Sequence, residues 1–366
     1  MQLGGNCPAS CLLGAAIALG LTPALADTAP AQGSIGFKQL DYSDSQPGLD
    51  RMQVRSSAIG IVAPMGDQWA VEGTWVIDGI SGASPAYHNA VKSAKPVTDT
   101  RKGADVRLSH YLPAATVSLS LSTSDEADYF SRAMSLQLSH SSDDRNTTVT
   151  LGVAYTDDDI NPVNKAVVGA KKQTHELLLG VTQVLTPQDI VQLNITDATG
   201  QGYFTDPYKL LDNRPTTRRQ QTALARWNHH YTALEATQKL SFRYYKDSFG
   251  IESTQFSLEW AQALPQGWTV TPLLRFYSQS AAYFYVPPDP ALPGAIAIPQ
   301  DYVPGQTLLS FDPRLSSFTA STYGLKVAKR LDKDWSADLR VEQYRQSSDA
   351  TPLDARFIQL GLTRIF

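Results

Sequence analysis

Charged side chains recur at every second position in several segments of the C-terminal half of the chain. In the segment WSADLRVEQY, Asp338, Arg340 and Glu342 alternate with apolar residues, so the three would share one face of a β-strand. The same spacing places further polar and charged residues on that face of neighbouring segments: Arg226, His230, Lys239, Arg243, Glu259, Arg275, Tyr277 and Lys326. A wall with charges of both signs could bias which ions or solutes pass through a water-filled lumen. It could instead be an ion-paired network that braces or plugs a barrel.

Side chains suited to catalysis or metal binding do not form a recognisable set. No Gly-x-Ser-x-Gly sequence is present, and no Ser/His/Asp set can be placed from spacing alone. His229 and His230 are adjacent on an expected strand, so they face opposite sides and cannot share one metal ion. Two acidic segments, DEAD at 125–128 and TDDDINP at 156–162, offer carboxylates that Ca²⁺ favours, but neither has the spacing of a strong calcium motif. We therefore predict no catalytic residues, no metal site and no cofactor.

The first 26 residues have the pattern of a cleaved signal peptide. An apolar stretch from Cys11 to Leu21 is followed by Ala24-Leu25-Ala26, the small-x-small sequence that signal peptidase reads, although no Lys or Arg precedes the stretch. Both cysteines, Cys7 and Cys11, lie in this leader, so the mature chain 27–366 would contain no disulfide or thiolate metal site.

The mature chain has the composition of a folded exported protein. The formal net charge is −4 and there is no basic stripe, so nucleic acid is not an expected partner. No run of 18 apolar residues follows the leader, so no membrane-spanning helix is expected. Such a chain would be periplasmic, secreted, or a membrane β-barrel.

A two-residue alternation of apolar and polar side chains dominates the sequence after residue 27. In ATVSLSLST, Val117, Leu119 and Leu121 point one way while serines and threonines point the other, so one face suits lipid and the other water. Segments of this kind number sixteen: 34–43, 51–62, 69–80, 101–111, 115–124, 129–140, 146–156, 173–184, 189–198, 218–230, 236–247, 250–264, 268–280, 316–329, 334–347 and 355–366. The pattern predicts an all-β, antiparallel, up-and-down transmembrane barrel over residues 27–366, because bacterial barrels have an even number of strands.

The lengths of the connections support this count. Barrels of the outer membrane have short periplasmic turns and longer extracellular loops. The long connections, 81–100, 157–172, 199–217 and 281–315, all fall on one side, and the seven connections on the other side are short. The 281–315 connection is rich in Pro and aromatic residues, so it is a candidate for a plug or lid, or for an outer loop packed on its neighbours.

The C-terminal segment ARFIQLGLTRIF ends in an aromatic residue. Phe366 on such a strand resembles the signal that the barrel assembly machinery of the outer membrane recognises. This ending argues against the alternative of a soluble β-sandwich. Pro272 falls in the middle of an expected strand, where it removes a ladder hydrogen bond, and we expect a β-bulge there.

Four segments together resemble a family of proteobacterial outer-membrane proteins known as domain of unknown function 3570. They are DGISGASP at 78–85, GYFTDPYK at 202–209, FRYYKDSFGI at 242–251 and RFYSQSAAYFY at 275–285. The resemblance implies a barrel and brings no catalytic residues. It also implies genomic neighbours that include small lipoproteins, thioredoxin-like proteins and flavin-attaching enzymes, so a periplasmic lipoprotein is a candidate partner.

The sequence favours a porin-like channel for small solutes or ions, located in the bacterial outer membrane. Its expected partners are outer-membrane lipid, lipopolysaccharide and the barrel assembly machinery. One alternative is a non-conducting barrel that scaffolds a periplasmic or surface partner in an envelope redox or metal setting. A second alternative is a surface hydrolase, although we expect no enzyme activity.

Overall fold

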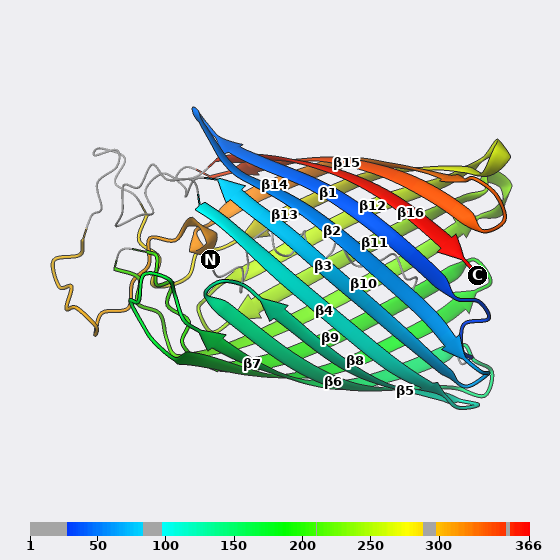
Figure 1. Cartoon of the computed structure of the whole chain (residues 1–366), viewed down its shortest axis with the longest axis horizontal. Coiled ribbons are helices and arrows are strands. Elements are labelled where there is room, and N and C mark those ends of the chain that lie inside the picture. The colour runs from blue at the N-terminus through cyan, green and yellow to red at the C-terminus, as the bar shows by residue number, and fades with distance from the viewer. Residues whose placement is uncertain (1–27, 83–96, 210, 288–297, 349–351) are drawn as a thin grey trace.

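The computed structural model describes residues 28–82, 97–209, 211–287, 298–348 and 352–366, and within these residues the chain forms one closed antiparallel barrel (Figure 1). Its sixteen strands are β1 (Ser34–Gln46), β2 (Leu49–Met65), β3 (Trp69–Gly82), β4 (Val97–Tyr111), β5 (Ala115–Asp125), β6 (Tyr129–Ser141), β7 (Thr147–Ile160), β8 (Ala170–Thr186), β9 (Asp189–Gly202), β10 (Thr217–Tyr231), β11 (Ala236–Asp247), β12 (Glu252–Leu264), β13 (Trp268–Gln279), β14 (Phe318–Arg330), β15 (Trp335–Ser347) and β16 (Leu353–Ile365). The expected leader over residues 1–26 lies outside the described residues.

Each strand pairs with its neighbours in sequence, and β1 closes the ring against β16. Ser34 lies opposite Val62 on one side and opposite Ile365 on the other. The predicted fold class and strand count are therefore confirmed. Because the ring is closed, none of the described strands has an unpaired edge, and an unpaired edge in lipid would leave backbone polar groups without partners. No helix among the described residues has the length and apolar character needed to cross a membrane.

The two faces of the strands follow the predicted alternation. On β5, Leu119 and Leu121 are 42% and 57% exposed. Ser118 of the same strand points to the other face and is only 8% exposed. The same outward phase on β6 and β7 carries Met134, Leu136 and Leu151, all exposed. The barrel thus presents a continuous apolar surface to the outside, as a surface that contacts acyl chains must.

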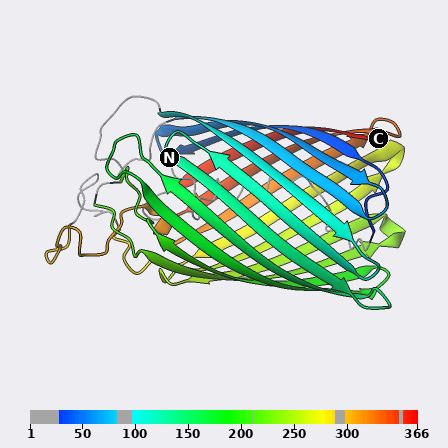
Figure 2. The ribbon, with the colours of Figure 1, turned by 60° about the horizontal axis from the view of Figure 1, so that its bottom comes forward.

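The two ends of the barrel differ in the length of their connections (Figure 2). We call them the turn end, where both termini of the strand ring lie, and the loop end. At the turn end the connections are as short as residues 187–188, and at the loop end they include 203–216 and 280–317. The 157–172 connection is shorter than predicted, because β7 continues to Ile160 and β8 begins at Ala170.

The β-bulge expected at Pro272 is not present. The pairing of β12 with β13 keeps one register on both sides of it, from Glu259↔Leu273 to Gln262↔Val270, and only the ladder beside Trp260 is interrupted. On the other side, Pro272 pairs in register with Leu325 of β14. The prediction was wrong because the missing N–H breaks the ladder locally without inserting an extra residue.

Candidate functional site

The charged wall predicted from the sequence lies on the inner face of β10 to β15. Five of its members are grouped on β13, β14 and β15. Lys326 and Arg340 are opposite in register, Lys326 Nζ lies 3.9 Å from Asp338 Oδ2, and the Arg340 guanidinium donates to Glu342. Arg275 joins the group from β13, where its Nε donates to Ser257 Oγ at 3.3 Å. This part of the wall therefore holds two ion pairs, Lys326–Asp338 and Arg340–Glu342, and one arginine, Arg275, that bonds to a neutral hydroxyl.

The members on β10, β11 and β12 are arranged differently. Arg226 Nη1 donates to Gln192 Oε1 at 3.3 Å, and His230 Nδ1 lies 3.0 Å from Thr237 Oγ1. Lys239 is opposite Glu259 in register, and the Arg243 guanidinium lies 5.8 Å from the centre of the Tyr245 ring. Within the described residues, Arg226, Lys239 and Arg243 have no carboxylate within 4.0 Å. Their charges are therefore not neutralised by an ion pair.

Lys38 on β1 belongs to the same wall and was not predicted from the sequence. It lies opposite Gly361 of β16, which in turn lies opposite Asp338 of β15. Gly361 is needed here, because a Cβ at this position would lie 2.5 Å from Asp338 Oδ1. Because Gly361 has no side chain, the carboxylate of Asp338 can extend over the inner face of β16 toward Lys38. Nothing in the local pattern around residue 38 reveals a neighbour 300 positions away, since only closure of the ring brings the two together.

The wall carries more positive than negative charge. Apart from Asp44, Arg218 and Asp247, which are ion-paired near the loop end, and Arg330, the last residue of β14, the inner face of β10 to β15 and β1 presents seven Lys or Arg side chains and three carboxylates. The cations are Lys38, Arg226, Lys239, Arg243, Arg275, Lys326 and Arg340, and the anions are Glu259, Asp338 and Glu342. On the rest of the ring, the inner faces of β5, β6 and β9 carry mostly Ser, Thr, Asn and Gln, whereas the inner phase of β3, β4 and β8 also carries charged residues: Glu72, Asp105, Arg107 and Glu176.

Among the described residues, four ion pairs with buried carboxylates lie inside the barrel near the loop end. Each joins two neighbouring strands: Arg51–Asp44 at 3.7 Å, Arg101–Asp78 at 3.3 Å, Lys172–Asp158 at 2.9 Å and Arg218–Asp247 at 2.5 Å. The four carboxylate side chains are at most 4% exposed. We call these pairs the inner rim. These pairs were not predicted, because charged residues were assigned to a face only in the segments that form β10 to β15.

An apolar cluster interrupts the polar inner face just below the inner rim. Its side chains come from β1, β2, β3 and β14 to β16, and include Leu40, Tyr42, Val54, Ile80, Phe318, Tyr344 and Phe357. The rings of Tyr42 and Phe357 are 4.8 Å apart, and Tyr277, which was predicted to line the lumen, lies 5.5 Å from Phe318. The inner face is therefore not uniformly polar.

Three connections at the loop end pack together. The described part of 280–317 bonds to 203–216 through reciprocal backbone hydrogen bonds between Asn213 and Leu309, of 2.8 and 3.0 Å. Arg214 Nη2 lies 2.9 Å from Asp312, and Arg314 Nη2 lies 2.7 Å from Asp206. Phe249 and Ile251 of the 248–251 turn pack with Ala282, Phe284 and Leu315. This packing agrees with the interpretation of 281–315 as an outer loop held by its neighbours.

Asp312 is the centre of this loop network. Burial opposes its ionisation, but the charges of Arg314, Lys209 and Arg214 outweigh the burial and hold the pKa of Asp312 well below its usual range. The carboxylate also accepts from the backbone N–H of Arg314 at 3.1 Å. Connections 203–216 and 280–317 are therefore joined by a charge network that requires an ionised Asp312, and the 248–251 turn joins them through apolar packing.

The two acidic segments considered for Ca²⁺, 125–128 and 156–162, differ in how their carboxylates are placed. Carboxylate oxygens of Glu126 and Asp128 lie within 4.8 Å of each other and of Asp99. In the second segment, Asp158 points inward to Lys172, whereas Asp157 and Asp159 are on the outward phase with Arg132. His229 and His230 face opposite sides as predicted, since His229 Nδ1 lies 2.7 Å from Asp189 on the outer face.

A closed antiparallel ring with an apolar outside, a charged inside and turns of unequal length at its ends is a transmembrane β-barrel of the bacterial outer membrane. Solved structures support the fold. The chain is similar to a bacterial polysaccharide outer membrane secretin, with a TM-score of 0.52 and 6% identity over 91% of this chain and 98% of that chain. It is also similar to CdiB from Acinetobacter baumannii, with a TM-score of 0.50 and 10% identity over 89% of this chain and 60% of that chain.

The chain belongs to the family described as "Protein of unknown function (DUF3570)", whose model matches residues 87–171 and 165–360. The resemblance inferred from four sequence segments is thereby confirmed. A search of curated proteins finds no match.

Proposed function

We propose that this barrel is a channel for small solutes with a preference for anions. The observation that carries the proposal is the excess of Lys and Arg on the inner face of β10 to β15 and β1. A barrel of about sixteen strands is wide enough for an aqueous channel. Charged rings or walls along such a channel bias which ions pass.

Arg226, Lys239 and Arg243 are the residues that would set this preference. The ion-paired group around Lys326 and Asp338 contributes less field, because its charges are largely compensated by each other. A unit charge about 10 Å from a permeating ion in water contributes roughly 0.4 kcal/mol, or about twofold in relative permeability. The effect is screened by salt, so it is largest at low ionic strength.

Planar-bilayer recordings test the proposal. The purified barrel should give steady single-channel steps, and the reversal potential in a KCl gradient should indicate that Cl⁻ passes more readily than K⁺. Arg243→Gln should lower the anion preference by about twofold at low salt. Arg55→Gln is the matched control, because Arg55 is an exposed cation on the outer face of β2.

Two results would contradict the proposal. A barrel that folds but gives no steps favours the scaffold alternative. An open channel that prefers cations, or one whose selectivity changes equally in both variants, excludes the inner cations as its cause.

A further inference from the structure

The outward face of the barrel is built differently at its two ends. Five of the six tryptophans, Trp69, Trp227, Trp260, Trp268 and Trp335, lie near the turn end. Several of them contact a cation or an imidazole. Trp69 stacks on His110 with ring centres 4.0 Å apart, Lys329 Nζ lies 4.8 Å from the Trp268 ring, and Arg364 lies 5.6 Å from the Trp335 ring. Aromatic girdles with basic neighbours are typical of a phospholipid interface.

At the loop end the same outward phase carries acid–base pairs. On β6 to β8, Arg132 Nη2 lies 2.7 Å from Asp157 and Lys171 Nζ lies 3.2 Å from Asp159. On β9 and β10, Arg219 binds Asp197 through both Nε and Nη2, with a shortest distance of 2.7 Å. We define the loop-end charged patch as these residues with the two amides that bond to them: Arg132, Asp157, Asp159, Lys171, Gln173, Asp197, Arg219 and Gln221.

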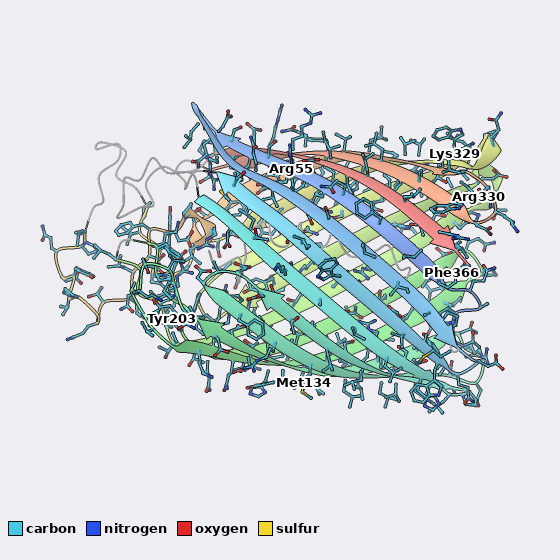
Figure 3. The ribbon with its side chains drawn as sticks, viewed as in Figure 1. Arg55, Met134, Tyr203, Lys329, Arg330 and Phe366 are labelled. Carbon is cyan, nitrogen blue, oxygen red and sulfur yellow. The ribbon has the colours of Figure 1, made fainter. Side chains whose placement is uncertain are left out.

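The position of the loop-end charged patch on the outer face indicates that it lies at the level of the lipid headgroups. It continues the outward phase of Met134, Leu136 and Leu193, all of which are exposed apolar residues. Lys or Arg on the lipid face costs about 2–4 kcal/mol at the bilayer midplane and about 0–1 kcal/mol near the interfaces, so such residues belong at headgroup level. Figure 3 shows the same arrangement, with charged outward residues toward the ends and apolar ones between them. Arg55 lies toward the loop end, Met134 on the outside between the ends, and Lys329 at the turn end.

The side chains of the patch remain open to a ligand. Arg132, Lys171 and Arg219 are 53%, 61% and 61% exposed although each is ion-paired. Asp197 occupies the Nε–Nη2 edge of Arg219, and a guanidinium has further N–H donors beyond that edge. The paired carboxylates hold the cations in fixed positions on three neighbouring strand pairs.

We propose that the loop-end charged patch binds the phosphorylated sugar headgroup of lipid A in the outer leaflet. Arg and Lys match phosphate, and Arg does so with two parallel hydrogen bonds. Asp157, Asp159 and the amides of Gln173 and Gln221 supply acceptors and donors for sugar hydroxyls. A Mg²⁺ ion held by one or two carboxylates and a phosphate would add a bridge. A headgroup of phosphate alone would not use the three carboxylates and two amides.

The proposal is independent of channel activity. It accounts for the difference between the two ends of the outer surface, because the outer membrane has phospholipid in the leaflet next to the periplasm and lipopolysaccharide in the other. Tryptophan with isolated cations faces the first, and the acid–base patch faces the second.

The test measures the temperature at which the folded, fast-migrating band of the full-length barrel is lost on a gel. The purified protein is placed in phosphatidylethanolamine/phosphatidylglycerol vesicles, with or without lipid A, in the presence of Mg²⁺. We expect lipid A to raise this temperature for the wild type, and dephosphorylated lipid A to raise it by less than half as much. The triple variant Arg132→Gln, Lys171→Gln, Arg219→Gln should lose most of the increase and need about tenfold more lipid A, equivalent to about 1.4 kcal/mol.

Lys329→Gln is the matched control, since it removes an outward cation at the turn end and should keep the full increase. The single variants Arg132→Gln and Arg219→Gln replace the triple variant if that protein does not fold. The proposal is wrong if the patch variants respond to lipid A as the wild type does, or if Lys329→Gln loses as much. It is also wrong if additional phosphatidylglycerol reproduces the increase, because the patch would then bind any lipid phosphate.

Discussion

Gly33 and Phe366 hydrogen-bond to each other in both directions, with each backbone N–H donating to the other's carbonyl oxygen at 2.9 Å. The contact extends the closure of the ring by one residue, before Ser34 at the start of β1 and after Ile365 at the end of β16. A Cβ on Gly33 would lie 2.4 Å from Cε2 of the Phe366 ring, so the absence of a side chain lets the ring lie against the backbone. The start of β1 and the end of β16 are thus held together by backbone bonds that do not depend on the aromatic ring itself.

Replacing the terminal ring should therefore separate assembly from stability. Phe366→Ala keeps both backbone hydrogen bonds, and the ring is 59% exposed, so the refolded barrel should unfold at nearly the wild-type urea concentration. If the ring is the assembly signal, the amount of folded barrel in the outer membrane of cells should fall severalfold. Leu362→Ala is the control, because it removes an outward apolar side chain from the same strand. Equal losses in both variants would show that the terminal ring has no special role.

Arg218 and Arg219 offer a second comparison, since adjacent residues on β10 make ion pairs on opposite faces of the barrel. The inner pair joins Arg218 to Asp247, which also accepts from Tyr245 Oη at 2.7 Å and from the backbone N–H groups of Phe249 and Ile251 at 3.0 Å. The side chain of Arg218 is 6% exposed, whereas that of Arg219 is 61% exposed. Breaking a buried pair by removing one partner costs about 3–5 kcal/mol, and exposed pairs contribute little.

Arg218→Leu should accordingly destabilise the barrel near the 248–251 turn, and Arg219→Leu should leave it almost unchanged. Amide hydrogen exchange measures the difference, with the N–H groups of Phe249 and Ile251 losing protection only in the first variant. Similar exchange in both variants would mean that the inner rim does not stabilise the loop end.

The strands were predictable because lipid and water on opposite sides impose a period of two on every segment. Leu119 and Leu121 illustrate this, since each has the exposure that the alternation assigns to it. The alternation predicts which face of the barrel a side chain lies on, but it does not predict which side chains from other strands lie next to it. The neighbourhood of Lys38 and Asp338 depends on closure between the two ends of the chain, which no local pattern contains.

Tertiary packing also explains the other differences. The apolar cluster of Leu40, Tyr42 and Phe357 lies on the inner face, where alternation alone predicts polar residues, because these side chains pack against one another. Pro272 was expected to distort its strand, yet the paired strands on both sides hold it in register. The network of Arg214 and Asp312 joins two loops about one hundred residues apart in the sequence, so its members could be identified only from the structure.

The loop network should open at low pH. The folded-state pKa of Asp312 lies well below the value of about 3.9 for an unfolded Asp, so its ionised form stabilises the packed loops above that value. This stabilisation is lost as the pH falls through the folded-state pKa. Burial raises the pKa of the neighbouring Asp212 instead, so that carboxyl contributes in the opposite direction, and a variant is needed to isolate Asp312.

Asp312→Asn keeps the shape of the side chain but removes the charge that Arg214 and Arg314 share. We expect the packed loops to lose at most about 3 kcal/mol near pH 7, because the partly buried Arg214 and Arg314 each lose one carboxylate and keep another. Limited proteolysis within 298–308 as a function of pH is the measurement. The wild type should become sensitive only below about pH 4, while the variant should be cleaved at every pH tested. Asp301→Asn, an exposed acid on the same loop, serves as the control and should follow the wild type. If Asp312→Asn resists cleavage at pH 7 as well as the wild type does, the charge network does not hold the loops together.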